Sequence, residues 1–102
     1  MWRMNAAELT VVDRPYLSRY EGLVDGEVVA YADYEVRGAI VVMPHTVTLP
    51  AHRGNGFAGR VVQYALDDVR RSGRTVVASC WYVAQYIDEH PEYADLRTGL
   101  DG

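Results

Sequence analysis

The sequence of 102 residues has one cysteine, no lysine and no apolar run near the ~20 residues that a membrane-spanning helix requires. A single thiol, Cys80, can form neither an internal disulfide nor a metal cluster by itself, so we expect a reducing, cytoplasmic compartment and no bound metal. The first residues, Met1–Asn5, carry one charge and no apolar segment behind it, so no secretory signal is expected.

The charge balance excludes a further class of function. The formal net charge is −4, whereas binding to nucleic acid needs clustered basic side chains, so we expect neither a nucleic-acid nor a membrane partner. The ten basic residues are all arginines, and half of them are close in sequence, which favours a small anionic ligand over a polymer. These are Arg53, Arg60, Arg70, Arg71 and Arg74. With 49% apolar and 24% charged residues, we expect one globular domain over 1–102, with a core at about 7–96.

The first half of the chain has the residue pattern of four strands. Asp25-Gly26 is a strong hairpin signal, and Gly38 marks a second tight turn. Pro44 cannot donate a hydrogen bond to a neighbouring strand, so it indicates a bulge or an unpaired edge in the fourth strand. That strand should have one regular half and one opened half. The four expected strands cover 9–12, 16–24, 28–36 and 39–49.

The second half changes to a helical period. Apolar residues recur every four positions from Phe57, which predicts an amphipathic helix over 57–71, ended by Gly73. A short apolar strand over 75–79 should run parallel to the fourth strand, because a helix separates them. A second helix is expected over 82–89, and the tail over 97–102 should be frayed. The fold class is therefore α/β (α+β), a compact mixed sheet of about five strands with two helices in the order β-β-β-β-α-β-α.

The stretch over 49–60 is rich in glycine and lies between a strand and a helix. Free backbone N–H groups at a helix N-terminus make an anion site, and Arg53 and Arg60 can add hydrogen bonds to phosphate. The stretch lacks the Gly-Lys-Ser/Thr of a nucleotide-triphosphate loop and the spacing of a dinucleotide fingerprint. A glycine-rich corner that binds nothing is the competing interpretation.

Three motifs carry a family resemblance over about 16–96. Arg53-x-x-Gly56-x-Ala58 resembles the signature of GNAT acetyltransferases. His45-Thr46 before it, and Cys80-Trp81-Tyr82-Val83 with His90-Pro91-Glu92-Tyr93 after it, are similar to the short one-domain GNAT-like group of the YjdJ type.

The resemblance implies acetyl-CoA as cosubstrate, with the pantetheine arm between the fourth and fifth strands and the thioester near Cys80. It implies direct attack of an amine on the thioester, helped by a base and an oxyanion donor. The cosubstrate-binding residues that it implies are Val47, Thr48, Arg53, Gly54, Asn55, Gly56, Phe57, Ala58, Gly59, Arg60 and Cys80.

The candidate catalytic residues are His45 and Cys80. His45 is either a base at the acceptor cleft or an ordinary strand histidine, and Cys80 is a nucleophile, a contact for the thioester or a small buried residue. The chain departs from the family pattern at Asp88, where larger relatives have a tyrosine that protonates the thiolate. It departs again at Val47, where the short group often has glutamate.

Other residues of these motifs have structural interpretations. We expect His90 and Glu92 to end the last helix and His52 to face solvent. Tyr82, Tyr86 and Tyr93 are expected to form core and cleft wall.

Three functions are consistent with these observations. The first is an N-acetyltransferase that acetylates an amine, as a monomer or homodimer. The second is an acyl-CoA-binding module with little catalysis, and the third is a structural α/β module in which the arginine-glycine loop binds nothing.

Overall fold

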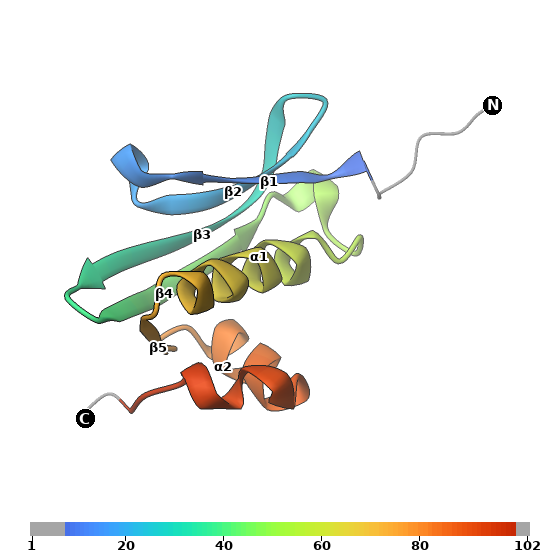
Figure 1. Ribbon diagram of the computed structural model, residues 1–102. Coiled ribbons are helices and arrows are strands. Elements are labelled where there is room, and N and C mark those ends of the chain that lie inside the picture. The colour runs from blue at the N-terminus through green and yellow to red at the C-terminus, as the bar shows by residue number, and fades with distance from the viewer. Residues whose placement is uncertain (1–7, 100–102) are drawn as a thin grey trace.

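The computed structural model describes residues 8–99, which form one five-stranded sheet with helices packed against it (Figure 1). The expected start of the core at residue 7, and the signal region at Met1–Asn5, lie outside the described residues. The strands are β1 (Thr10–Arg14), β2 (Arg19–Val24), β3 (Glu27–Arg37), β4 (Ile40–Thr48) and β5 (Thr75–Val77). The helices are α1 (Phe57–Arg71) and α2 (Trp81–Glu89), with short 3-10 turns η2 (Pro15–Leu17), η3 (Pro50–His52) and η4 (Pro91–Leu96).

The sheet has the mixed topology that the sequence predicts. Strands β1 to β4 pair with their sequence neighbours in antiparallel fashion, and β5 pairs with β4 in parallel after the α1 crossover. The expected second strand is wrong at its start, since β2 begins at Arg19. Pro15 opens the 3-10 turn η2, and Ser18 leaves it in the left-handed region at φ 55°.

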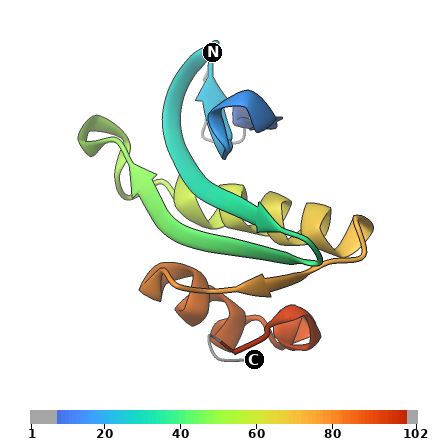
Figure 2. The same ribbon diagram turned by 90° about the vertical axis from the view of Figure 1, so that its left-hand side faces the viewer.

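Strand β4 has the bulge and the opened half that Pro44 predicts. His45 pairs with Asp33 and Val42 pairs with Glu35, so Met43 and Pro44 together face Tyr34 alone. On its other edge β4 pairs with β5 only over 40–42. The last hydrogen bond across this edge runs from the Cys80 N–H to the Met43 carbonyl at 3.0 Å. Beyond it the two chain segments diverge (Figure 2).

The core lies between the sheet and α1. The apolar face of α1 is buried, and it consists of Phe57, Val61, Val62, Ala65, Leu66 and Val69. Gly22 of β2 permits a close approach of this helix, because a β-carbon there would lie 2.9 Å from Cγ2 of Val61. The helix spans the residues that the four-residue period predicts.

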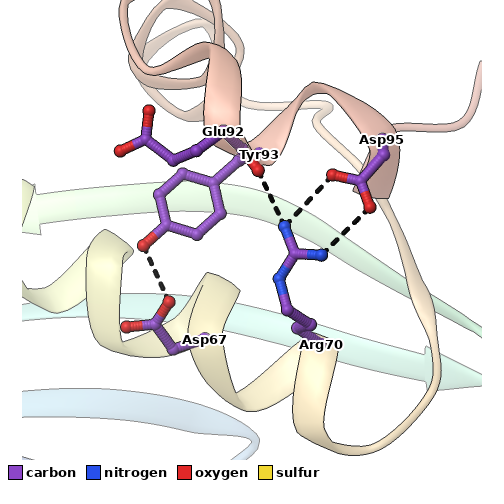
Figure 3. Close-up of polar contacts among 5 residues, drawn as sticks. All are labelled: Asp67, Arg70, Glu92, Tyr93 and Asp95. Atoms are coloured by element: carbon purple, nitrogen blue, oxygen red, sulfur yellow. Dashed lines mark hydrogen bonds and ion pairs between the residues drawn. The ribbon is translucent and has the colours of Figure 1, made fainter.

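A polar clamp holds η4 against α1 (Figure 3). Arg70 donates to both oxygens of Asp95 at 3.0 and 3.1 Å and to the Glu92 carbonyl at 2.8 Å. The Tyr93 hydroxyl donates to Asp67 at 2.7 Å. Burial, together with this hydrogen bond, raises the pKa of Tyr93 to about 12, so the hydroxyl stays protonated at neutral pH.

The expectation of a frayed tail is wrong at its first residues. Arg97 bridges to Val76, and the Thr98 N–H donates to the Val76 carbonyl at 2.8 Å. The segment after η4 therefore pairs with the outer edge of β5. The rest of the predicted tail, residues 100–102, lies outside the described residues.

Candidate functional site

A pocket of about 490 Å³ lies where β4 and β5 diverge. It is enclosed by the second half of β4, the first turn of α1 and the first turn of α2. The lining residues are Thr46, Val47, Thr48, Arg53, Ala58, Cys80, Trp81 and Tyr82. Five of these were predicted from the sequence as site residues: Val47, Thr48, Arg53, Ala58 and Cys80.

The edge of β4 beside this pocket offers backbone groups to a ligand. The Leu49 N–H donates to the Val29 carbonyl of β3 at 2.9 Å. Because backbone groups alternate between the two edges of a strand, those of Val47 also point toward β3. Those of Thr46 and Thr48 point toward the pocket, where β5 no longer pairs with β4. An extended ligand can therefore hydrogen-bond to this edge as an added strand would.

The N-terminus of α1 supplies a second set of backbone donors. Gly56 caps the helix in the left-handed region at φ 75°, and no side chain in the described part of the chain caps this end. The first hydrogen bond of the helix runs from the Arg60 N–H to the Gly56 carbonyl at 3.3 Å. The N–H groups of Phe57, Ala58 and Gly59 therefore have no acceptor within the helix, and the positive end of the helix dipole lies there. This arrangement suits an anion such as phosphate.

The preceding loop is held by its own contacts. Gly54 has φ 87°, a conformation that L side chains rarely adopt, and the Asn55 side chain donates to the His52 carbonyl at 3.1 Å. The expectation that His52 faces solvent is wrong, since it is half-buried with its ring 6.3 Å from that of Phe57. Phe57 is itself buried, so only its backbone is available to a ligand.

The predicted arginine cluster divides between the two ends of α1. Arg53 lines the pocket and Arg60 is exposed in the first turn of the helix. The other three lie at or just beyond the C-terminal end of α1. That end is ~15 Å from Arg60 along the helix axis, at 1.5 Å of rise per residue. There Arg70 forms the clamp described above, Arg71 pairs with Asp68 at 3.0 Å, and Arg74 donates to the Gly38 carbonyl at 3.0 Å. Of the five arginines, only Arg53 and Arg60 therefore lie near the pocket.

Cys80 lies where the two strands part. It is 8% exposed and occupies the position before the first turn of α2. Its thiol donates to the Thr46 hydroxyl, with sulfur and oxygen 3.6 Å apart. Thr46 belongs to the His45-Thr46 motif but was not predicted as a site residue, because its contact with Cys80 depends on where the two strands diverge.

Two aromatic residues of the first turn of α2 complete the wall. Tyr82 was expected to form core and cleft wall, whereas Trp81 was not predicted as a site residue. Trp81 is 73% exposed, and Tyr82 lies against α1. A methyl group added to Gly59 would lie 3.3 Å from the Tyr82 hydroxyl, which places that hydroxyl beside the first turn of α1. Burial, followed by the charges of Glu89 and Cys80, raises the pKa of Tyr82. The contiguous Cys80-Trp81-Tyr82 motif, directly after a strand, was the available signal.

The other tyrosines and His90 have the structural roles that were expected. Tyr93 is buried in the core, and Tyr86 packs against it with ring centroids 6.2 Å apart. His90 follows the last turn of α2, stacks on Tyr86 at 3.9 Å between ring centroids, and places its Nδ1 2.7 Å from the Tyr86 carbonyl.

His45 lies outside the pocket. Adjacent residues of a strand point to opposite faces, so His45 points away from the face that carries Thr46. Its side chain is 70% exposed, and its Nδ1 is 3.4 Å from Oδ2 of Asp33. The structure thus brings Cys80 into the pocket and leaves His45, with Asp33, on the other face of the sheet.

Residues 8–99 lack two kinds of feature. They contain no group of three or more His, Cys, Asp or Glu side chains placed to hold a metal ion. No helix among them is long and apolar enough to cross a membrane.

Comparisons with known proteins agree with this geometry. Residues 19–96 match the family model for GCN5-related N-acetyl-transferase. Protein NATD1 of Gallus gallus is 35% identical over 78 residues, which cover 76% of this chain and 69% of the relative.

Two solved structures share the fold. A GCN5-like protein from Staphylococcus aureus superposes with a TM-score of 0.64 over 92% of each chain, at 17% identity. A GNAT family acetyltransferase from Brucella melitensis, solved in complex with acetyl-CoA, gives a TM-score of 0.54 at 17% identity. That match covers 67% of this chain, which spans half the length of the Brucella protein.

Proposed function

Because the chain belongs to the GCN5-related N-acetyltransferase (GNAT) family, we propose that it transfers an acetyl group from acetyl-CoA to an amine by direct attack on the thioester. The observation that supports this proposal most is that one pocket is bordered by both an unpaired strand edge and a helix N-terminus. The free edge of β4 suits the amides of a pantetheine arm, and the uncapped N-terminus of α1 suits a pyrophosphate.

The proposed placement of acetyl-CoA follows from these donors. The pyrophosphate accepts hydrogen bonds from the amides of Phe57, Ala58 and Gly59, with Arg53 adding positive charge. The pantetheine arm pairs with the backbone of Thr46 and Thr48. The thioester then lies near Cys80, where β4 and β5 converge. The acetyltransferase from Brucella melitensis, solved in complex with acetyl-CoA, has the same fold, which supports this choice of cosubstrate.

The reaction requires one bond to form and one to break. A neutral amine attacks the thioester carbon, the C–N bond forms, the C–S bond breaks, and the proton lost by the amine ends on the departing thiolate. Tyr82 lines the pocket, and its raised pKa keeps its hydroxyl protonated, so it can donate a hydrogen bond to that thiolate.

We propose no role as base for His45, because its side chain lies outside the pocket on the other face of the sheet, with its Nδ1 3.4 Å from Oδ2 of Asp33. In this proposal Cys80 contacts the thioester, and no acyl-cysteine intermediate forms.

Ligand-dependent stability and turnover test the proposal together. Acetyl-CoA and CoA should raise the melting temperature, whereas ATP and NAD at equal concentration should not, because only the CoA pair carries pantetheine for the edge of β4. Acetylation of at least one member of an amine panel should follow. The chain has no lysine, so label found on lysine must be on an added acceptor. Equal stabilisation by ATP would contradict the placement of acetyl-CoA.

A second candidate is an acyl-CoA-binding module without turnover. Val47 and Asp88 favour it, since the family resemblance implies a glutamate and a tyrosine at these two positions. Stabilisation by acetyl-CoA with no acetylation of any amine would select it. In either case we propose a cytoplasmic protein, a monomer or homodimer, with no nucleic-acid or membrane partner.

A further inference from the structure

A second depression, of about 170 Å³, runs along the exposed side of α2. It is lined by Trp81, Tyr82, Gln85, Tyr86 and Glu89, and we call it the α2 groove. Trp81 and Tyr82 also line the 490 Å³ pocket, so the two hollows share a wall next to Cys80. A molecule in the groove would therefore have one end close to the proposed position of the thioester.

The lining of the groove is suited to an organic cation. Three of its five residues are aromatic, one is a carboxylate, and none is basic. Within residues 8–99, the hydrogen-bond partner of the Glu89 carboxylate is the uncharged Gln85 amide, at 3.1 Å. No arginine pairs with Glu89 in the same range, whereas Asp88 beside it pairs with Arg97 at 3.2 Å. Aromatic faces next to an unneutralised carboxylate attract ammonium groups.

The positions along α2 set the length of that cation. Glu89 is eight positions after Trp81, which corresponds to ~12 Å along the helix axis. A diamine with about eight carbons has a similar extended length, so one nitrogen would lie near the thioester and the other at Glu89.

We propose that the α2 groove binds the acceptor, and that the acceptor is an elongated aliphatic diamine or polyamine. One amine, in its neutral form, attacks the thioester, while a second, as ammonium, pairs with Glu89. The chain between them lies over Trp81 and the tyrosines. This inference rests on the proposed acetyl transfer, but binding in the groove can be measured without turnover.

The experiment uses the eight-carbon diamine, the four-carbon diamine and n-octylamine, which has the length but lacks the second ammonium. Their KM and kcat are measured in the wild type, in Glu89→Gln and in Glu27→Gln. Glu27 is exposed at the start of β3, so its variant controls for the loss of one negative charge. Binding is followed independently by the side-chain amide signals of Gln85 in CoA-saturated protein, because Gln85 lines the groove and not the pocket.

We expect the eight-carbon diamine to have the lowest KM and to shift the Gln85 signals. Glu89→Gln should raise that KM by roughly fivefold and leave that of n-octylamine unchanged. Shifted Gln85 signals without turnover would support the groove and contradict the proposed transfer. Turnover of other amines with no length preference and no effect of Glu89→Gln would overturn this inference and leave the transfer intact. Absence of both turnover and Gln85 shifts would also overturn it.

Discussion

Cys80 and Thr46 are the residues whose side chains meet where the sheet opens. The thiol is almost fully buried and donates to the threonine hydroxyl, while its backbone N–H makes the last bond to β4. A thiol in this position is protected from solvent and oriented by a neutral partner. The partner that the thiol hydrogen-bonds to is a neutral hydroxyl and not a base, which favours a contact role over that of a nucleophile.

The Cys80→Ala variant tests this role. It should fold and bind CoA as the wild type does. Its kcat should fall by roughly tenfold, because the substitution removes a contact with the thioester but does not remove a covalent step. Brief incubation of the wild type with acetyl-CoA should give no acetyl adduct on Cys80 by mass spectrometry. An adduct that an added amine discharges, together with near-complete loss of turnover in the variant, would make Cys80 the nucleophile.

Single residues differ in how far the sequence predicts their place. Cys80 and Arg53 could be assigned because motifs next to a strand end and a helix start fix their positions. The role of Arg70 could not be predicted, because its ion pair depends on η4 packing against α1 and bringing Asp95 next to it. Thr46 escaped prediction for the same reason, as its partner is 34 residues away in sequence.

The N-terminus of α1 is the element on which the proposed binding of phosphate depends. Gly56 has a positive φ, and the space that a side chain would occupy there is open, so a ligand can fill that space. The long helix behind it is fixed by its buried apolar face. A change at the cap should therefore affect the ligand more than the fold.

The Gly56→Asp variant should lose most of its affinity for CoA, because a β-carbon and a carboxylate would meet the phosphate groups. Gly38→Asp is the matched control. It has the same left-handed backbone, at φ 61°, in the turn between β3 and β4, and nothing lies within 4 Å of an added β-carbon. Both variants carry a similar backbone strain of about 1 kcal/mol, and only Gly56→Asp should weaken binding in a calorimetric titration. Equal affinities would place the phosphates elsewhere.

The elements differ in predictability according to length. The four-residue period of α1 extends over four turns, so its bounds followed from the sequence. The 3-10 turns η2 and η4 were not predicted, because segments of three to six residues carry no periodic signal. The start of β2 was missed as a consequence of η2.

At the scale of the whole molecule, one irregularity organises the site. Pro44 cannot donate to a neighbouring strand, and the bulge there separates the regular half of β4 from its free edge. The sequence predicted this division and the parallel placement of β5. It could not predict the pocket itself, which requires β4, α1 and α2 to be placed together in space. The C-terminal segment adds one parallel bridge, from Arg97 to Val76, on the outer side of β5.

The central claim is that acetyl-CoA lies between β4 and β5 with its pyrophosphate at α1. Amide chemical-shift mapping of the ¹⁵N-labelled protein during titration with acetyl-CoA tests it most directly. The account predicts the largest shifts at Thr46, Thr48, Cys80 and the amides over 54–59. It predicts none at the separate cavity of about 130 Å³ lined by Tyr20 and Asp68 at the far end of α1. Shifts concentrated at that cavity, with the 54–59 amides unchanged, would contradict it.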